Sequence, residues 1–324
     1  MKKWKILVYA VTLLLVVFFL YFYKFDLNIF SAILNYYYLI LAFLAYITSI
    51  FIASYRTKFF LNSLSKSHFN FSSLIKAEFI NKSAYYIIPG RFNIPVKAIA
   101  LNKFFSLGKI RSLSITSFEF FFDTAVTLLI ASTGLFIFTQ GLPFFDLHKF
   151  ILFFFFTLIV LLVFFAFPFK WIQLVEKKFL KIKFNKIAFF FEIFFRFIKE
   201  SRKIWKSLIF NKNFIPILFF TALYWIISIL VYYFLFFSAG VSASLSYLTV
   251  ILSFGIFISG ISQIPGGLGI RDGVMVFLFS SLGYPESASL MVVIVQRIFS
   301  IVPTLIGYFF LTKLGINFLS NKVK

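Results

Sequence analysis

Long apolar runs alternate with short polar segments along the chain, and the length of these runs predicts membrane-spanning helices. A helix needs about 20 mainly apolar residues to cross the hydrocarbon core of a bilayer. The first run resembles a signal peptide, but it is too long and no small-residue cleavage site follows, so we expect an uncleaved span. The predicted spans cover residues of about 6–23, 36–54, 113–138, 150–167, 214–237 and 288–311.

Two further apolar stretches, about 79–105 and 246–283, are interrupted by proline and glycine in "IIPGRFNIP" and "QIPGGLGIRDG". Lipid cannot satisfy irregular backbone N–H and C=O groups, so such breaks occur at membrane depth only against protein or a wet cavity. We therefore predict two re-entrant helical hairpins. Both share a plan of apolar arm, Pro-Gly turn, arginine and apolar arm. We therefore expect an inverted repeat, with the first hairpin opening inward and the second outward.

The composition indicates a polytopic membrane protein. Hydrophobic residues make up 61% of the 324 residues and charged residues 13%, whereas soluble domains average about half and about a quarter. No separate soluble domain stands out, so we expect one all-α transmembrane bundle over residues 1–324. The chain has no cysteine and only two distant histidines, His68 and His148, which argues against zinc, haem and thiolate sites. We expect no metal and no cofactor.

The net charge of +22 comes mainly from lysines and arginines in the polar segments between apolar runs. This placement follows the positive-inside pattern and argues against nucleic acid as a partner. It predicts a multi-pass cell-membrane protein with both termini in the cytoplasm and only Lys24 and Lys149 outside, provided that both broken stretches re-enter. A cytoplasmic loop after the second span is expected to contain Arg56, Lys58, Lys66 and Lys76.

The longest polar segment, 170–213, has twelve Lys or Arg against three Glu and is predicted to be a basic cytoplasmic loop. Within it, the stretch 189–210 places Phe, Ile and Trp on one side at helical spacing and charges on the other. This pattern is typical of an amphipathic helix at the membrane interface. Either the helix binds anionic lipid head groups, or its charges only follow the positive-inside pattern.

Ionisable residues also lie inside the apolar stretches. A charge within a span costs at least about 2.5 kcal/mol on insertion scales, so such residues are functional by default. Glu119 and Asp123 share a helix face and would repel each other unless a cation lies between them or one is protonated. We expect arginines as their partners; the alternative role is a structural lock between the two halves. The interior charges are Glu119, Asp123, Asp272, Arg91, Arg271 and Arg297.

The "PGGLG" turn predicts an anion site. Its glycines allow a sharp turn with uncovered backbone N–H groups, and a half-helix starting near Ile270 would direct its positive end at a cavity. The alternative is an ordinary loop in water. Pro89, Gly90 and Pro265 would shape the two turns, and no catalytic residue is predicted. The substrate-binding candidates are Arg91, Glu119, Asp123, Gly266, Gly267, Gly269, Arg271, Asp272 and Arg297.

The same residues resemble a known family. "PGGLGIRDG", followed about 25 residues later by "QR", resembles a signature of the lysylphosphatidylglycerol synthase/flippase-like membrane-domain family. "IIPGRFNIPVKAIALNKFFSLGKIRSLSITSFEFFFD" resembles its other signature, with Asn93 and Ile94 where members usually have Gly-Glu. The resemblance implies a lipid translocase with two opposed re-entrant hairpins. Some members carry an appended aminoacyltransferase or glycosyltransferase domain, and we see neither in this sequence.

These patterns together predict a transporter rather than an enzyme. We expect a flippase for an anionic or phosphate-bearing lipid, either a modified phospholipid or a polyprenyl-phosphate-linked sugar. Arg271, the half-helix N-terminus and Arg91 would hold the phosphate, while Glu119 and Asp123 would pair with Arg297 or with a cationic head group. The alternatives are the membrane component of a lipid-modifying transferase and a scaffold subunit, and a hydrophobic cation stays open as substrate. The expected partners are membrane lipids and, for the transferase, a soluble transferase.

Overall fold

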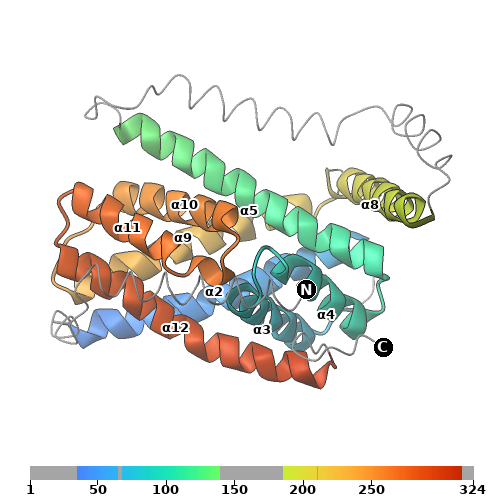
Figure 1. The fold of residues 1–324 in the computed structure, drawn as a ribbon, viewed down its shortest axis with the longest axis horizontal. Coiled ribbons are helices and arrows are strands. Elements are labelled where there is room, and N and C mark those ends of the chain that lie inside the picture. Colours follow the sequence, from blue (N-terminus) through green and yellow to red (C-terminus); the bar gives the residue numbers. More distant parts are fainter. Residues whose placement is uncertain (1–34, 65–67, 139–184, 210, 316–324) are drawn as a thin grey trace.

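The computed structural model describes residues 35–64, 68–138, 185–209 and 211–315, and every regular element in these ranges is helical (Figure 1). The predicted all-α fold class is confirmed. Outside the described residues lie the predicted spans 6–23 and 150–167 and the loop residues Lys24, Lys66 and Lys149. In chain order the elements are α2 (Tyr36–Leu64), α3 (Phe71–Ile87), α4 (Asn93–Phe105), α5 (Lys109–Phe138), α8 (Asn185–Ile209), α9 (Phe214–Ser238), α10 (Leu245–Ser262), the 3-10 turn η2 (Pro265–Gly267), α11 (Ile270–Ser281) and α12 (Glu286–Lys313).

Among the described helices, α2, α9 and α12 are long and apolar enough to cross a membrane. They contain 29, 25 and 28 residues. At about 1.5 Å per residue, each is longer than the roughly 30 Å hydrocarbon core. The spans predicted over 36–54, 214–237 and 288–311 are confirmed as helices of this kind. The span predicted over 113–138 forms the helix α5, which is not among the described helices that are long and apolar enough to cross a membrane.

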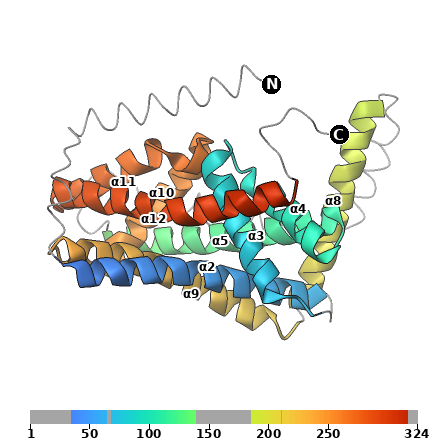
Figure 2. The same cartoon turned by 90° about the horizontal axis from the view of Figure 1, so that it is seen from below.

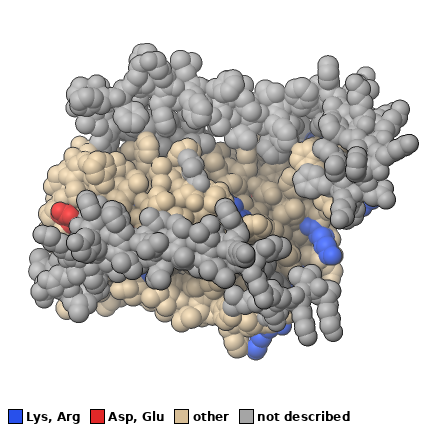
Figure 3. All heavy atoms as spheres, in the orientation of Figure 1, with Lys and Arg blue, Asp and Glu red and all other residues tan. Residues whose placement is uncertain are grey.

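The outer surface of the bundle agrees with a lipid environment. Large apolar side chains are exposed on these helices, including Ile40 on α2, Ile215 on α9 and Leu305 on α12, which are 58%, 76% and 63% exposed. On the face seen in Figure 3, the described atoms are mostly uncharged, and the Lys and Arg side chains gather towards the end where α4 and α8 lie. Apolar surface of this extent is rare on soluble monomers and marks a membrane or protein contact.

The polar loop predicted after the second span is wrong, because α2 continues to Leu64. Arg56 and Thr57, which follow the predicted end of the span, are only 4% and 0% exposed. They have polar partners on other helices, which offset the cost of placing these polar side chains inside the bundle. Lys58 also lies in α2, and Lys76 lies in α3.

The first hairpin consists of α3 and α4, which pack against each other across a break at residues 88–92. Its first arm begins at Phe71, several residues before the predicted start. The Asn70 side chain accepts a hydrogen bond of 3.0 Å from the Ser72 N–H, which caps α3 at this position. The two helical arms and the break predicted over 79–105 are present, but the first arm is longer than predicted, and re-entry into the membrane stays a prediction.

The second hairpin consists of α10 and α11, which pack across a break at residues 263–269. Its arms agree with the predicted range of 246–283, and α11 begins at Ile270 as expected. Gln263 ends α10 in a left-handed conformation with φ of 55°, and Pro265 begins the 3-10 turn. Proline and glycine therefore end the helix where the sequence predicts.

The helix predicted over 189–210 is confirmed as α8. It docks on α5, where the Trp205 ring stacks on Phe118 with centroids 5.9 Å apart and Ser201 lies 3.2 Å from Ser114, hydroxyl to hydroxyl. Ion pairs on the other side of α8 are exposed. Lipid binding by that charged side stays a prediction.

The helices pair across the bundle: α2 packs along α9, α3 along α12 and α10 against α5. Figure 2 shows α2 and α9 side by side along one face. Contact between α3 and α12 is close, since a Cβ at Gly307 would lie 1.9 Å from the carbonyl oxygen of Phe79. Two apolar clusters fill the interior, one centred on α2, α9, α11 and α12 and the other on α2 to α5. This packing positions the polar groups described below.

Candidate functional site

The tips of the two hairpins, residues 88–92 and 263–269, contact each other. The Gly90 N–H donates a hydrogen bond of 2.7 Å to the carbonyl oxygen of Gln263. Just below the tips, the Tyr85 hydroxyl lies 2.8 Å from the Ser259 hydroxyl. The two breaks, which lie more than 170 residues apart in the sequence, therefore form one joined structure.

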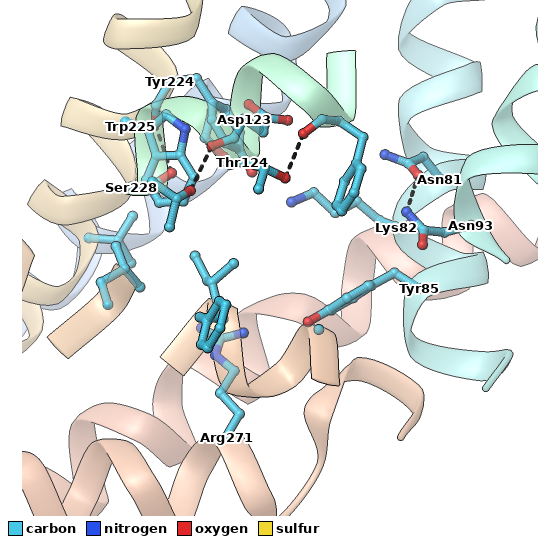
Figure 4. Close-up of a pocket in the computed structure, with 18 of the residues that line it drawn as sticks. Asn81, Lys82, Tyr85, Asn93, Asp123, Thr124, Tyr224, Trp225, Ser228 and Arg271 are labelled. Atoms are coloured by element: carbon cyan, nitrogen blue, oxygen red, sulfur yellow. Dashed lines mark hydrogen bonds between the residues drawn. The ribbon is translucent and has the colours of Figure 1, made fainter. Parts of the chain in front are cut away.

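A cavity of about 430 Å³ lies beside the joined tips (Figure 4). This volume is within the usual range of small-ligand sites, about 300–1,000 Å³. Its walls come from α2, α3, α4, α5, α9, α10, α11 and α12 and from the first hairpin tip. Tyrosines, amides and hydroxyls dominate the polar part of the wall. They are Tyr46, Tyr85, Tyr86, Tyr224, Tyr232, Asn81, Asn93, Gln296, Ser49, Ser228, Thr124 and Thr127.

Three cations line this cavity without a carboxylate partner within ion-pair distance in the described part of the chain: Lys82, Arg91 and Arg271. Lys82 lies 5.9 Å from the centroids of the Tyr46 and Tyr224 rings. Figure 4 shows Arg271 across the cavity from Asp123 and Tyr224. Aromatic faces stabilise these cations but do not neutralise them, so the cavity carries positive charge.

Among the described residues, Arg271 is bound on one side of its guanidinium only, through its Nη2. It is 6% exposed, and its Nη2 donates a hydrogen bond of 2.6 Å to the Tyr232 hydroxyl. Within the described residues, its Nε–H has no hydrogen-bond partner although it is buried. Arg91 is held more loosely, 5.2 Å from the Phe120 ring centroid and 3.5 Å from the Ile256 carbonyl oxygen. Both guanidiniums keep donor capacity for an anion.

Asp123 also lines the cavity, but Arg56 of α2 binds it. Two hydrogen bonds join their side chains, one of them 3.0 Å long between Nη2 and Oδ2. The Arg56 guanidinium also lies 5.5 Å from the Tyr224 ring centroid. The prediction that Arg91, Arg271 or Arg297 pairs with Asp123 is wrong, because the helix that faces Asp123 is α2.

Glu119 does not line the cavity. It lies in a buried cluster, one helical turn before Asp123 on α5. Its partners are Lys97, whose Nζ is 2.7 Å from Oε2, and the Thr57 hydroxyl. Lys97 also forms an ion pair with Glu78. The predicted pairing of Glu119 with an arginine is therefore also wrong. The sequence signal that was missed is a polar stripe on α3, where Glu78, Lys82 and Tyr85 recur at helical spacing.

The second hairpin tip is held by its own ion pair. Arg297 donates to Oδ1 of Asp272 from Nε at 2.9 Å and from Nη2 at 2.7 Å, and its Nη1 donates to the Gly266 carbonyl oxygen at 2.9 Å. Oδ2 of Asp272 accepts a hydrogen bond of 3.1 Å from the Gly269 N–H. The start of α11 is thus occupied by a carboxylate of the chain itself, and the prediction that this turn offers its N–H groups to an anion is wrong at Gly269.

Two glycines of the tip have no room for a side chain. Gly266 and Gly267 have φ of 60° and 66°, which favours glycine. A Cβ at Gly266 would lie 2.4 Å from the Tyr86 ring, and a Cβ at Gly267 would lie 2.5 Å from the Ser259 hydroxyl. These residues and the buried Pro265 shape the turn and hold it against α3 and α10.

The predicted site residues therefore fall into separate groups. Arg91, Asp123 and Arg271 line the cavity. Glu119 belongs to the buried cluster around Lys97. The residues that build the hairpin tips are Pro89, Gly90, Pro265, Gly266, Gly267, Gly269, Asp272 and Arg297.

Comparison with known proteins places the chain in a family. The family described as "Lysylphosphatidylglycerol synthase TM region" matches residues 5–307. A UPF0104 membrane protein from Methanothermobacter thermautotrophicus is 38% identical over 84 residues, so the match covers 26% of this chain and only 24% of that protein. No solved structure matches the chain. Because the family match covers most of the sequence, this membrane protein belongs to the lysylphosphatidylglycerol synthase transmembrane-region family.

Proposed function

We propose that this protein is a lipid translocase that moves a lipid with an anionic, phosphate-bearing head group between the leaflets of the cell membrane. One observation carries the proposal: Lys82, Arg91 and Arg271 converge on one cavity and have no carboxylate partner in the described residues. Uncompensated charge inside a membrane protein is costly and marks a substrate pathway. A phosphate group supplies the missing negative charge and accepts several hydrogen bonds.

The lining of the cavity favours an anion over a cation. Asp123 is the carboxylate among the described lining residues, and Arg56 already neutralises it. A cationic head group would therefore meet three cations without a free counter-ion. The tyrosine, asparagine and serine side chains around the cavity suit the hydroxyl groups of a glycerol or sugar. A modified phospholipid and a polyprenyl-phosphate-linked sugar both meet this description.

The arrangement of helices supports an inverted repeat with two re-entrant hairpins. In this scheme α2, α3, α4 and α5 correspond in order to α9, α10, α11 and α12. The contact between α3 and α12 then has its counterpart in the contact between α10 and α5. The contact between α2 and α9 joins two equivalent helices. The hairpin tips are equivalent in this scheme and meet near its centre. We infer that they enter the membrane from opposite sides, with both termini in the cytoplasm. Rocking of the halves would alternate access to the cavity.

Reconstitution tests this function. Purified protein in liposomes is given lipids with labelled phosphate-bearing, neutral or cationic head groups, and a membrane-impermeant quencher reports label that leaves the inner leaflet. We expect movement of the phosphate-bearing lipids and its loss in Arg271→Gln, while Lys203→Gln on the exposed side of α8 keeps the wild-type rate. Equal rates for wild type and Arg271→Gln would contradict the proposal. Binding of lipid without movement would favour the membrane component of a lipid-modifying transferase and its soluble partner.

A further inference from the structure

A buried cluster of Thr57, Glu78, Lys97 and Glu119 lies next to the cavity. Each of these residues is at most 3% exposed. They come from four helices, α2, α3, α4 and α5, and one ammonium group binds both carboxylates. The Lys97 ammonium therefore lies between the two acids.

The charges of this cluster do not balance when all its groups are ionised. Two carboxylates and one ammonium leave one net negative charge in an apolar surrounding, which is costly. Neither of the other cations nearby forms an ion pair with these carboxylates within the described residues: Arg56 binds Asp123, and Lys82 lies on the cavity wall beside two tyrosine rings. One bound proton on the carboxylate pair removes the imbalance.

The hydrogen-bond contacts of the Thr57 hydroxyl also support a proton on one of the two carboxyl groups. The Thr57 hydroxyl oxygen lies 3.0 Å from Oε1 of Glu78, within hydrogen-bond distance of Oε1 of Glu119, and 3.1 Å from Nζ of Lys97. A hydroxyl has one hydrogen, so it donates to at most one carboxylate, and the Ala53 carbonyl oxygen at 3.1 Å also competes for that hydrogen. The contact with the second carboxylate is a hydrogen bond only when that carboxyl group carries a proton.

The charged groups near this cluster come from α2, α3 and α5. Arg56 of α2, Lys82 of α3 and Asp123 of α5 are the nearest further charges. From α9 the facing ionisable group is Tyr224, and α10 has no Asp, Glu, Lys or Arg. On α8, Ser201 and Trp205 contact α5, and on α12 Gly307 contacts α3.

Two polar routes connect the cluster to the cavity. On one side, Glu119 and Asp123 are one helical turn apart, and Asp123 lines the cavity. On the other side, Nδ2 of Asn81 lies 3.3 Å from Oε2 of Glu78, and Nδ2 of Asn93 donates to Oδ1 of Asn81 at 2.9 Å. Both asparagines line the cavity. A proton on the cluster and an anion in the cavity are therefore electrostatically coupled.

We propose that Glu78 and Glu119 together bind one proton beside Lys97 and that this proton travels with the anionic lipid. The coupling rests on the proposed function; the proton site does not. The proton binds as an O–H bond on one carboxyl group and leaves to water, so no other reactant is required. An anion in the cavity favours the protonated cluster because it adds negative charge nearby, and by linkage the proton favours anion binding.

Infrared spectroscopy of the purified protein tests the site without any transport. Wild type at neutral pH should show the C=O band of a protonated, buried carboxylic acid. Glu78→Gln and Glu119→Gln should each lose this band, because one remaining carboxylate is balanced by Lys97. The control Glu192→Gln, in an exposed pair on α8, should keep it. Absence of the band in wild type, or its persistence in both cluster variants, would overturn the proton site.

Liposomes with a pH gradient test the coupling. If each lipid moves with one proton, the proton gradient carries labelled lipid towards the more alkaline side. At zero membrane potential, a difference of one pH unit should then give about tenfold accumulation in the more alkaline leaflet. Glu119→Gln should lose this response, and Glu192→Gln should keep it. Lipid movement by wild type that ignores the gradient would overturn the coupling while leaving the translocase intact. A wild-type protein with the infrared band but no lipid movement would overturn the coupling and the proposed function together, and the proton site would stand.

Discussion

The backbone N–H of Gly90 donates a hydrogen bond of 2.7 Å to the carbonyl oxygen of Gln263, and this contact joins the tips of the two hairpins. A bond between two irregular segments satisfies backbone groups that lipid would leave unpaired. The cavity opens beside this joint and takes its cations from both hairpins, with Arg91 on one side and Arg271 on the other. Separation of the tips is therefore the movement most directly connected with access to the cavity.

Locking the tips together should stop transport. Tyr85 and Ser259 touch through their hydroxyl groups, and the chain has no native cysteine to interfere. We expect the double variant Tyr85→Cys, Ser259→Cys to lose lipid movement after treatment with a short bifunctional thiol reagent. Each single variant should show no such effect of the reagent. Full movement by a completely cross-linked protein would mean that the tips stay together during transport.

A side chain at Gly266 should destabilise the protein more than a side chain at Gly283, which lies in another turn with positive φ. Gly266 and Gly283 both have positive φ, at 60° and 83°, so alanine brings a strain of about 1–2 kcal/mol at either position. Only at Gly266 would the Cβ also collide with the Tyr86 ring, since no heavy atom lies within 4 Å at Gly283. Thermal unfolding in detergent should therefore show a larger drop in Tm for Gly266→Ala than for Gly283→Ala. Equal drops would indicate that Tyr86 moves aside freely.

Breaking the ion pair between the buried Arg56 and Asp123, whose side chain is 27% exposed, should destabilise the protein more than replacing both residues with apolar ones. Removing one partner of a buried ion pair costs about 3–5 kcal/mol, because the other charge is left uncompensated. We expect Arg56→Met to destabilise the protein more than the double variant Arg56→Met, Asp123→Leu does. The exposed pair Arg196–Glu192 is the control, and its single variants should cost less than about 1 kcal/mol. Equal and additive losses at Arg56 and Asp123 would mean that the two charges are not coupled.

The cavity cations should contribute to anion affinity independently of transport. Hydrogen bonds to charged groups are each worth about 1.5–3 kcal/mol, which corresponds to about tenfold or more in affinity. Lys82→Gln and Arg91→Gln should each weaken binding of a detergent-soluble lipid phosphate, measured by calorimetry, by at least about tenfold. Lys203→Gln on α8 should leave it unchanged. Unaltered affinity in both cavity variants would place the phosphate elsewhere.

The sequence by itself determined the features that depend on neighbouring residues. Helices were predicted over 36–54, 214–237 and 288–311 from their length and apolar character, because a helix that crosses the hydrocarbon core needs an unbroken apolar run. Proline and glycine near 89 and 265 predicted where helices end, because these residues restrict or free the local backbone. The start of α11 at Ile270 followed from the same reasoning.

Only the tertiary structure decided which charges meet. Arg56 was predicted in a loop and instead binds Asp123, while Glu119 shares Lys97 with Glu78, and Asp272 binds Arg297 at the hairpin tip. Each pair joins different helices, so its geometry depends on how those helices pack and not on local spacing. A charge pattern in the sequence shows that buried charges need partners. Which residues become those partners depends on which side chains the packing of the helices brings within a few ångströms.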